Sequence, residues 1–325
     1  RLIFLFGLWI VCPQIWGADA NGYTALYECR ADGPNCNVDV ATLTAQACQQ
    51  IITTATTPTT DWTALNQSNN VMCIDAGDHS GRGTLTLTTS GTAVLRKILR
   101  YTRGGDNNDE PWNQSSANQA KMPKILINGQ DYWILHRLTF SGLSAPVIEL
   151  NLDGGALGNI FNRLWFTNIT GIGVTGAVRA LSGNNATASA PNVLQNSVAQ
   201  EFPSAFDVEV VFAETRSHFF WFVNNESFNI ASMFDSRGGA ADVAQGSVVE
   251  NSDHYTTTAY YTDCAGNLNV NGGCALVKSG ISLKRGGNAT NIVKILHNRI
   301  WGQRRTDHTN PTGCCTSTGL GDAIT

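Results

Sequence analysis

Short segments in which apolar and polar positions alternate recur along the middle of the chain, each followed by a polar pair and a second apolar piece. These segments are WILHRLTF (133–140), NIFNRLWF (159–166), FWFVNNESF (220–228), SVVENSDHY (247–255) and IVKILHNRIW (292–301). Alternation with a period of two predicts β-strands, and the polar pair predicts a tight turn of the kind that Asn tolerates. The sequence therefore predicts one strand–turn–strand unit that is used repeatedly.

The spacing of these units indicates how they are arranged. His136 and Asn162 are 26 residues apart, as are Asn224 and Glu250, whereas the remaining gaps between units are 62 and 47 residues. We expect longer loops to interrupt about two coils in these wider gaps. A strand–turn unit that recurs every roughly 20–50 residues is typical of a solenoid. Its stacked coils share a continuous core that short strands cannot form alone.

The predicted fold is therefore all-β, a right-handed single-stranded parallel β-helix. Equivalent residues on neighbouring coils would lie about 4.8 Å apart, so Asn side chains at corresponding turns would form hydrogen-bonded ladders. A β-sandwich is the alternative, because it also contains many short strands with turn signals. A sandwich, however, does not repeat the same strand–Asn–strand unit.

The first 20 residues have the pattern of a secretory signal peptide. An apolar run over residues 2–11 follows Arg1, and the small-residue motif Ala-Asp-Ala at 18–20 predicts cleavage before Asn21. A retained apolar strand or anchor is the alternative. The run is shorter than the roughly 20 apolar residues that cross a bilayer, so no membrane span is expected.

The rest of the chain divides into a short N-terminal segment and the β-helix. In residues 21–60 we expect a helix over VATLTAQACQQIITTA (40–55), which would cap the open end of the stack. Residues 61–325 would form the β-helix. The final GLGDAIT (319–325) has the pattern of a turn that enters another strand, so we expect the β-helix to be incomplete, truncated at its C-terminal end.

Cysteine usage agrees with export. Without Cys12, which lies in the predicted signal, eight cysteines remain: Cys29, Cys36, Cys48, Cys73, Cys264, Cys274, Cys314 and Cys315. An even number predicts disulfides in an oxidising compartment, and the local pairs Cys29–Cys36 and Cys264–Cys274 are the ones we favour. No C-x-x-C spacing occurs, so a zinc site is not expected. These features predict a secreted, periplasmic or cell-surface protein.

Charge is sparse overall but concentrated in one stretch. Charged residues are 14% of the chain and the formal net charge is −4, which argues against a nucleic-acid partner. Residues 264–306 nevertheless contain no Asp or Glu and hold seven cations: Lys278, Lys284, Arg285, Lys294, Arg299, Arg304 and Arg305. Such a stretch predicts an anionic ligand, and a solvated basic face is the alternative.

Two of these cations have a spacing that suggests catalysis. Lys284 and Arg305 are 21 residues apart, close to the length of one coil, and would then stand on neighbouring coils. A Lys can act as a general base and an Arg as a proton donor or charge clamp. Exposed cations at strand ends are the plainer interpretation of each residue alone.

The same region resembles a known family. The run GISLKRGGN (280–288), the downstream HNRIW (297–301) and the Lys–Arg separation are similar to the chondroitinase-B and alginate-lyase family of β-helical, pectin-lyase-like polysaccharide lyases. The resemblance is specific over about 30 residues and architectural over the rest. It implies that Lys284 abstracts the proton beside a uronate carboxylate and that Arg305 assists the leaving oxygen.

By this resemblance the protein would be a secreted lyase that cleaves an anionic polysaccharide by β-elimination. The cations expected to bind substrate carboxylates are Lys278, Arg285, Arg304 and Arg299. The family commonly uses Ca²⁺, but its acidic ligands are not matched, because Lys278 lies where they are expected and would repel a cation. Either Lys278 replaces the metal or the site is inactive. Glu250 and Asn251 are weak candidates for metal ligands and otherwise turn residues.

Other functions remain open. A glycoside hydrolase would need two nearby carboxylates, for which Asp207, Glu209 and Glu214 are available, although they cluster at no repeated strand end. A non-catalytic carbohydrate-binding, adhesive or filament-forming β-helix is the further alternative.

His136 and His297 are expected to be structural residues at equivalent turns. The strand-associated Trp133, Trp165, Trp221 and Trp301 are expected to pack in the core or at its flanks, with stacking on sugar rings as the alternative.

Overall fold

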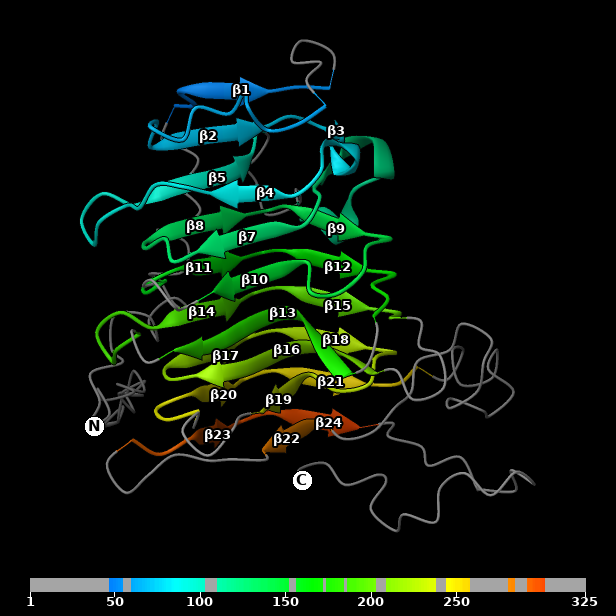
Figure 1. Cartoon of the computed structure of the whole chain (residues 1–325). Coiled ribbons are helices and arrows are strands. Elements are labelled where there is room, and N and C mark those ends of the chain that lie inside the picture. The colour runs from blue at the N-terminus through cyan, green and yellow to red at the C-terminus, as the bar shows by residue number, and fades with distance from the viewer. Residues whose placement is uncertain are drawn as a thin grey trace, which may run out of the picture.

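The fold is a right-handed parallel β-helix, in which successive coils stack along one axis (Figure 1). This computed structural model describes residues 47–54, 60–102, 110–151, 156–171, 174–183, 186–202, 209–237, 244–257, 280–283 and 291–301. Apart from the first and last described coils, each coil contributes one strand to each of three parallel sheets, and equivalent strands of neighbouring coils pair with each other. The predicted fold class is confirmed.

The strands have the following bounds. The nine-stranded sheet contains β1 (Gln50–Ile52), β2 (Val71–Ile74), β5 (Lys97–Tyr101), β8 (Trp133–His136), β11 (Ile160–Asn162), β14 (Asn192–Gln195), β17 (Phe220–Val223), β20 (Val248–Glu250) and β23 (Lys294–Leu296). The eight-stranded sheet contains β3 (Gly77–Asp78), β6 (Ala120–Lys121), β9 (Thr139–Ser141), β12 (Trp165–Thr167), β15 (Val198–Gln200), β18 (Glu226–Phe228), β21 (Asp253–Tyr255) and β24 (Arg299–Trp301). The seven-stranded sheet contains β4 (Leu85–Leu87), β7 (Ile125–Asn128), β10 (Ile148–Asn151), β13 (Val174–Gly183), β16 (Glu209–Ser217), β19 (Phe234–Ser236) and β22 (Ile281–Leu283).

Three short 3-10 helices, η1 (Ser80–Arg82), η2 (Pro111–Asn113) and η3 (Ser116–Asn118), lie in the connections of the first coils. None of the helices in the described ranges is long and apolar enough to cross a membrane.

The interior of the coils is filled by the inward-facing member of each alternating strand. Phe140 and Phe166 stack with ring centroids 5.2 Å apart, and Phe166 meets Phe212 edge-on at 5.3 Å. Phe212 continues to Phe222 at 5.2 Å. All four rings are fully buried. Because each ring packs against rings of the neighbouring coils, the core is one continuous column rather than a set of separate clusters.

The nine-stranded and eight-stranded sheets meet at a corner of two residues. The first corner residue has a left-handed backbone with φ between 47° and 55° on successive coils; we name this set the corner row: Arg137, Arg163, Asn196, Asn224, Asn251 and His297. Asn adopts this conformation more readily than most residues. The amide Nδ2 of Asn224 donates to Asn196 Oδ1 at 2.6 Å, and Asn251 Nδ2 donates to Asn224 Oδ1 at 3.0 Å. The predicted Asn ladder is therefore present.

The second corner residue stabilises the next coil. The backbone N–H of Ser197 donates to Asn225 Oδ1 at 2.9 Å, and that of Asn225 donates to Ser252 Oγ at 3.1 Å. The Ser252 N–H donates in turn to Asn298 Oδ1 at 2.9 Å. Alternating Ser and Asn side chains thus satisfy the corner N–H groups, which would otherwise be buried without partners.

The register of the repeats differs from the prediction in two places. His136 pairs with Asn162 as expected, but Glu250 pairs with Val223, so the stacking partner of Asn224 is Asn251. The proposed equivalence of His136 and His297 is also wrong, because His136 ends β8 whereas His297 belongs to the corner row. Both the last strand residue and the first corner residue are polar, and polarity alone does not distinguish them.

The two wider gaps also have different contents. Between Asn162 and Asn224 one additional coil intervenes, since β11 pairs with β14 and β14 with β17. Between Glu250 and His297 there is no additional coil, because Glu250 pairs directly with Leu296. The expectation of about two coils in that gap is therefore wrong.

The predicted capping helix over residues 40–55 is wrong in its described part. Residues 47–54 contain the strand β1, which pairs in parallel with β2, and a disulfide joins Cys48 to Cys73. Pairing with β2 outweighs the helical spacing of the apolar residues, because a strand added to the edge satisfies backbone groups that a helix would leave open. Residues 40–46 lie outside the described ranges.

Several predictions concern residues that the structure does not describe. The signal sequence (1–20) and the cysteines Cys29, Cys36, Cys264 and Cys274 lie outside the described ranges. The disulfide Cys48–Cys73 joins cysteines 25 residues apart, and it is not one of the two local pairs that we favour from the sequence.

Loss of one core ring should destabilise the whole stack. We expect Phe166→Ala to lower the free energy of unfolding by about 3–5 kcal/mol, because Phe166 is fully buried between two rings and its loss leaves a cavity. Guanidinium unfolding measures the change. Phe228→Ala is the control, since Phe228 is only half-buried; an equal loss in both variants would contradict the role of the inner column.

Candidate functional site

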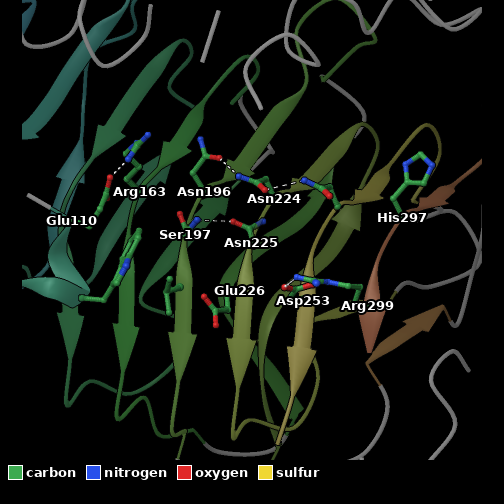
Figure 2. A pocket seen from close by; sticks show the side chains of 13 residues that line it. Glu110, Arg163, Asn196, Ser197, Asn224, Asn225, Glu226, Asp253, His297 and Arg299 are labelled. Carbon is green, nitrogen blue, oxygen red and sulfur yellow. Dashed lines mark hydrogen bonds and ion pairs between the residues drawn. The ribbon is translucent and has the colours of Figure 1, made fainter. Parts of the chain in front are cut away.

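A groove of about 690 Å³ runs along the outside of the corner between the nine-stranded and eight-stranded sheets (Figure 2). One side consists of the corner row from Arg163 to His297. The floor consists of the first residues of the strands that follow, Val198, Glu226, Asp253 and Arg299. The row crosses five coils, and four steps of about 4.8 Å give a length of roughly 19 Å.

The amides of the corner row present a repeating pattern of donors and acceptors. Asn196, Asn224 and Asn251 are half-buried, and each amide nitrogen carries two N–H groups. In the row one of the two N–H groups is used, by Asn196 toward Asn162 Oδ1 at 2.9 Å and by Asn224 and Asn251 toward the preceding amide. The row therefore fixes each amide in place and leaves one N–H per coil with no bond to a described residue.

Two carboxylates lie side by side in the floor of the groove. Glu226 begins β18 and pairs in register with Asp253, which begins β21. Arg299 pairs with Asp253 in the next coil and donates from Nε to Oδ1 at 2.7 Å and from Nη2 to Oδ2. One guanidinium group thus binds both carboxylate oxygens of Asp253, which is the strong, bidentate form of an Arg–carboxylate ion pair.

Glu226 has a neutral partner instead. The phenol of Tyr255 donates to Glu226 Oε1 at 2.6 Å. Burial, together with this carboxylate, raises the pKa of Tyr255, so the phenol stays protonated and donates its proton to the bond. The ring of Tyr255 is held between Phe228, at 5.3 Å, and Trp301, at 4.5 Å, in a nearly parallel stack. The stack covers the ring faces and fixes the phenol that orients Glu226.

The N-terminal end of the groove is closed by the connection between β5 and β6. Glu110, in this connection, forms ion pairs with Arg163 and, at 3.6 Å, with Arg137. The Arg137 side chain is fully buried and that of Glu110 nearly so. Trp112, two residues along in η2, lines the groove. The ion pairs therefore attach the segment that carries Trp112 to the corner row.

The predicted catalytic and substrate-binding residues are mostly not described. Lys278, Lys284, Arg285, Arg304 and Arg305 lie outside the described ranges. The last described residues before Lys284 and Arg305 are Leu283 and Trp301, which belong to β22 of the seven-stranded sheet and β24 of the eight-stranded sheet. Arg299 lies in the groove, paired with Asp253, and its binding of a substrate carboxylate stays a prediction.

The weak metal candidates are found in structural surroundings. Glu250 is fully buried, with His297 Nδ1 3.6 Å from its Oε1, and Asn251 is a member of the amide row. Within the described ranges no group of three or more His, Cys, Asp or Glu side chains could hold a metal ion. Calcium use stays a prediction from the family resemblance.

The other candidates divide between structure and surface. Trp133 and Trp221 are buried and donate from Nε1 to backbone carbonyls, as expected of packing residues, whereas Trp301 is 43% exposed. Burial, followed by the nearby Arg137 and Arg100, lowers the pKa of His136 to about 3, so its imidazole is neutral and bonded to Asn162. This agrees with the structural role predicted for His136.

Sequence reasoning missed Glu226 and Asp253. The acidic residues considered were Asp207, Glu209 and Glu214; Asp207 is not described, and Glu214 forms an ion pair with Arg216 in β16. Glu226 and Asp253 nevertheless occupy a repeated position, since both begin strands of adjacent coils. Aligning Asn224 with Asn251 rather than with Glu250 brings the two acids into line.

Comparison with known proteins identifies no relative: the chain matches no protein-family profile, and neither a curated protein nor a solved structure is significantly similar to it.

Removal of the charge of Glu110 should loosen the closed end of the groove. We expect Glu110→Gln to lower the free energy of unfolding by about 3–5 kcal/mol, because the change removes one charge of an ion pair with the fully buried side chain of Arg137. Urea unfolding measures the loss. Glu226→Gln is the matched control; its carboxylate is half-buried and has a neutral partner, so a change of about 0.5 kcal/mol or less is expected. Equal losses would show that Glu110 has no special anchoring role.

Proposed function

We propose that this protein binds an extended polysaccharide along the groove of the corner row. The observation that carries the proposal is the amide row, which offers fixed hydrogen-bonding groups at the spacing of the coils. Sugar hydroxyl groups both donate and accept hydrogen bonds. The length of one sugar residue in an extended glycan is of the same order as the distance between neighbouring coils. A polar, open groove of several coils suits such a chain better than a small apolar ligand, which would favour an enclosed pocket.

The aromatic residue at the closed end supports the same proposal. Trp112 is half-buried and lines the groove, and the apolar face of a sugar ring can pack on an indole. The stacked rings of Phe228, Tyr255 and Trp301 are less suited to this role, because their faces cover one another. Trp112 is thus the aromatic platform of the proposed site.

Export is a further part of the proposal. The disulfide Cys48–Cys73 is typical of a protein that folds in an oxidising compartment. A polysaccharide partner is encountered in the same surroundings.

Replacement of Trp112 tests the proposal. Titration calorimetry first measures the binding of the wild type to a panel of soluble polysaccharides of different composition. The variant is then titrated with the polysaccharide that the wild type binds most tightly. We expect Trp112→Ala to weaken binding about ten-fold, or about 1.4 kcal/mol, through loss of the indole contact. The control is Leu95→Ala, because Leu95 is an exposed apolar residue that does not line the groove. No binding to any member of the panel, or equal weakening in both variants, would refute the proposal.

Cleavage by β-elimination is a second proposal, and its support is the resemblance of residues 280–288 and 297–301 to motifs of the lyase family. The experiment incubates the protein with alginate, pectate and chondroitin sulfate and follows the ultraviolet absorbance of the unsaturated product. We expect product from the wild type and none from Lys284→Ala, since no base would then remove the proton beside the carboxylate. Product formation that survives the substitution removes this assignment.

A further inference from the structure

We propose that the groove selects glycans with protonated amino groups, that is, amino sugars with free amines, and that Glu226 binds the ammonium group. This inference rests on the proposed glycan binding and names the class of sugar. It depends on the distribution of charge in the groove, where one carboxylate differs from the others.

Two of the carboxylates that line the groove are neutralised by neighbouring guanidinium groups. Glu110 forms ion pairs with Arg137 and Arg163. Asp253 accepts two hydrogen bonds from Arg299, so the Nε and Nη2 groups of this guanidinium are already bound. Neither carboxylate therefore needs a cation from a ligand.

Glu226 is the exception among the described carboxylates of the groove. Its partner is the neutral phenol of Tyr255, which occupies Oε1 and leaves Oε2 without a bond from a described residue. Arg299 raises the local positive potential, but its hydrogen bonds go to Asp253. Among the residues that line the groove, Glu226, at the start of β18, is thus the carboxylate that no guanidinium group binds.

The geometry around Glu226 suits a bound ammonium group. Figure 2 shows its carboxylate in the floor of the groove, below the corner that Asn224 and Asn225 form. Tyr255, fixed by the aromatic stack, holds one oxygen in place, so little side-chain freedom is lost when a ligand binds the other. The amide groups of the corner row line the same groove and provide hydrogen-bonding partners for the hydroxyl groups of the bound sugar.

The row of first strand residues gives this charge a fixed place in the groove. In coil order the row reads Val198, Glu226, Asp253 and Arg299, so it passes from apolar to acidic to basic. A protonated amine gains a charge-assisted hydrogen bond at Glu226, whereas a uronate carboxylate would be repelled there. An N-acetylated sugar has no charge for Glu226 to bind.

The test compares oligosaccharides of equal length by titration calorimetry at a pH at which the amine is protonated. The three ligands are glucosamine, N-acetylglucosamine and uronate oligomers. We expect the wild type to bind the free amine at least ten-fold more tightly than the N-acetylated oligomer, and to lose most of this preference at high salt because the groove is partly exposed. Glu226→Gln should bring the ratio of the two affinities close to one.

The matched control is Glu201→Gln. Glu201 is an exposed carboxylate at the end of β15 that does not line the groove, so its replacement should leave the preference intact. Equal binding of amine and N-acetylated oligomers by the wild type, tighter binding of uronate, or a preference that survives Glu226→Gln would each overturn this inference while glycan binding itself stands. Failure of all three ligands together with the polysaccharide panel would instead refute the proposed function.

Discussion

Parallel pairing of each coil with the next is the constraint on which the rest of the structure depends. It places chemically equivalent positions one above another, about 4.8 Å apart, so every feature of the molecule is a row. Rows of like groups stabilise the stack when the groups are aromatic rings or amides, as in Phe140–Phe166 and Asn196–Asn224–Asn251. A row of like charges is unfavourable, which is why the adjacent acids Glu226 and Asp253 require Tyr255 and Arg299 beside them.

The left-handed corner couples the fold to the groove. Each first corner residue has a positive φ, and this backbone turns its side chain outward beside the start of the eight-stranded sheet. Asn meets the conformational requirement and supplies a hydrogen-bonding group, whereas Arg137 and Arg163 meet it at a higher cost and are held by Glu110. The same requirement therefore produces the amide row in the later coils and the closed end in the earlier ones.

Period and repeat in the sequence were sufficient to predict the architecture, but not the register. A polar residue at the end of a strand, such as Glu250, and one at the corner, such as Asn251, have the same pattern, and only strand pairing separates them. Because the site is defined by register, this one-residue shift concealed Glu226 and Asp253. The excess of cations in the sequence predicts a ligand site within residues 264–306. The groove instead consists of residues from Glu110 to Arg299, which are far apart in the sequence and are brought together by the stacking of the coils. The helix expected over residues 40–55 failed for a related reason, since pairing with β2 is not a local property.

The two proposed chemistries can be separated because they concern different rows. On the seven-stranded sheet, Glu214 and Asp235 stand in register, and each forms an ion pair with the arginine two residues later, Arg216 and Arg237. In the next strand Ser282 is the register partner of Asp235, so the sequence has no carboxylate two residues before Lys284. The glycan groove is built from the other two sheets. Substitution of Lys284 therefore tests catalysis while the groove is intact, and substitution of Glu226 tests sugar selection while the base is intact.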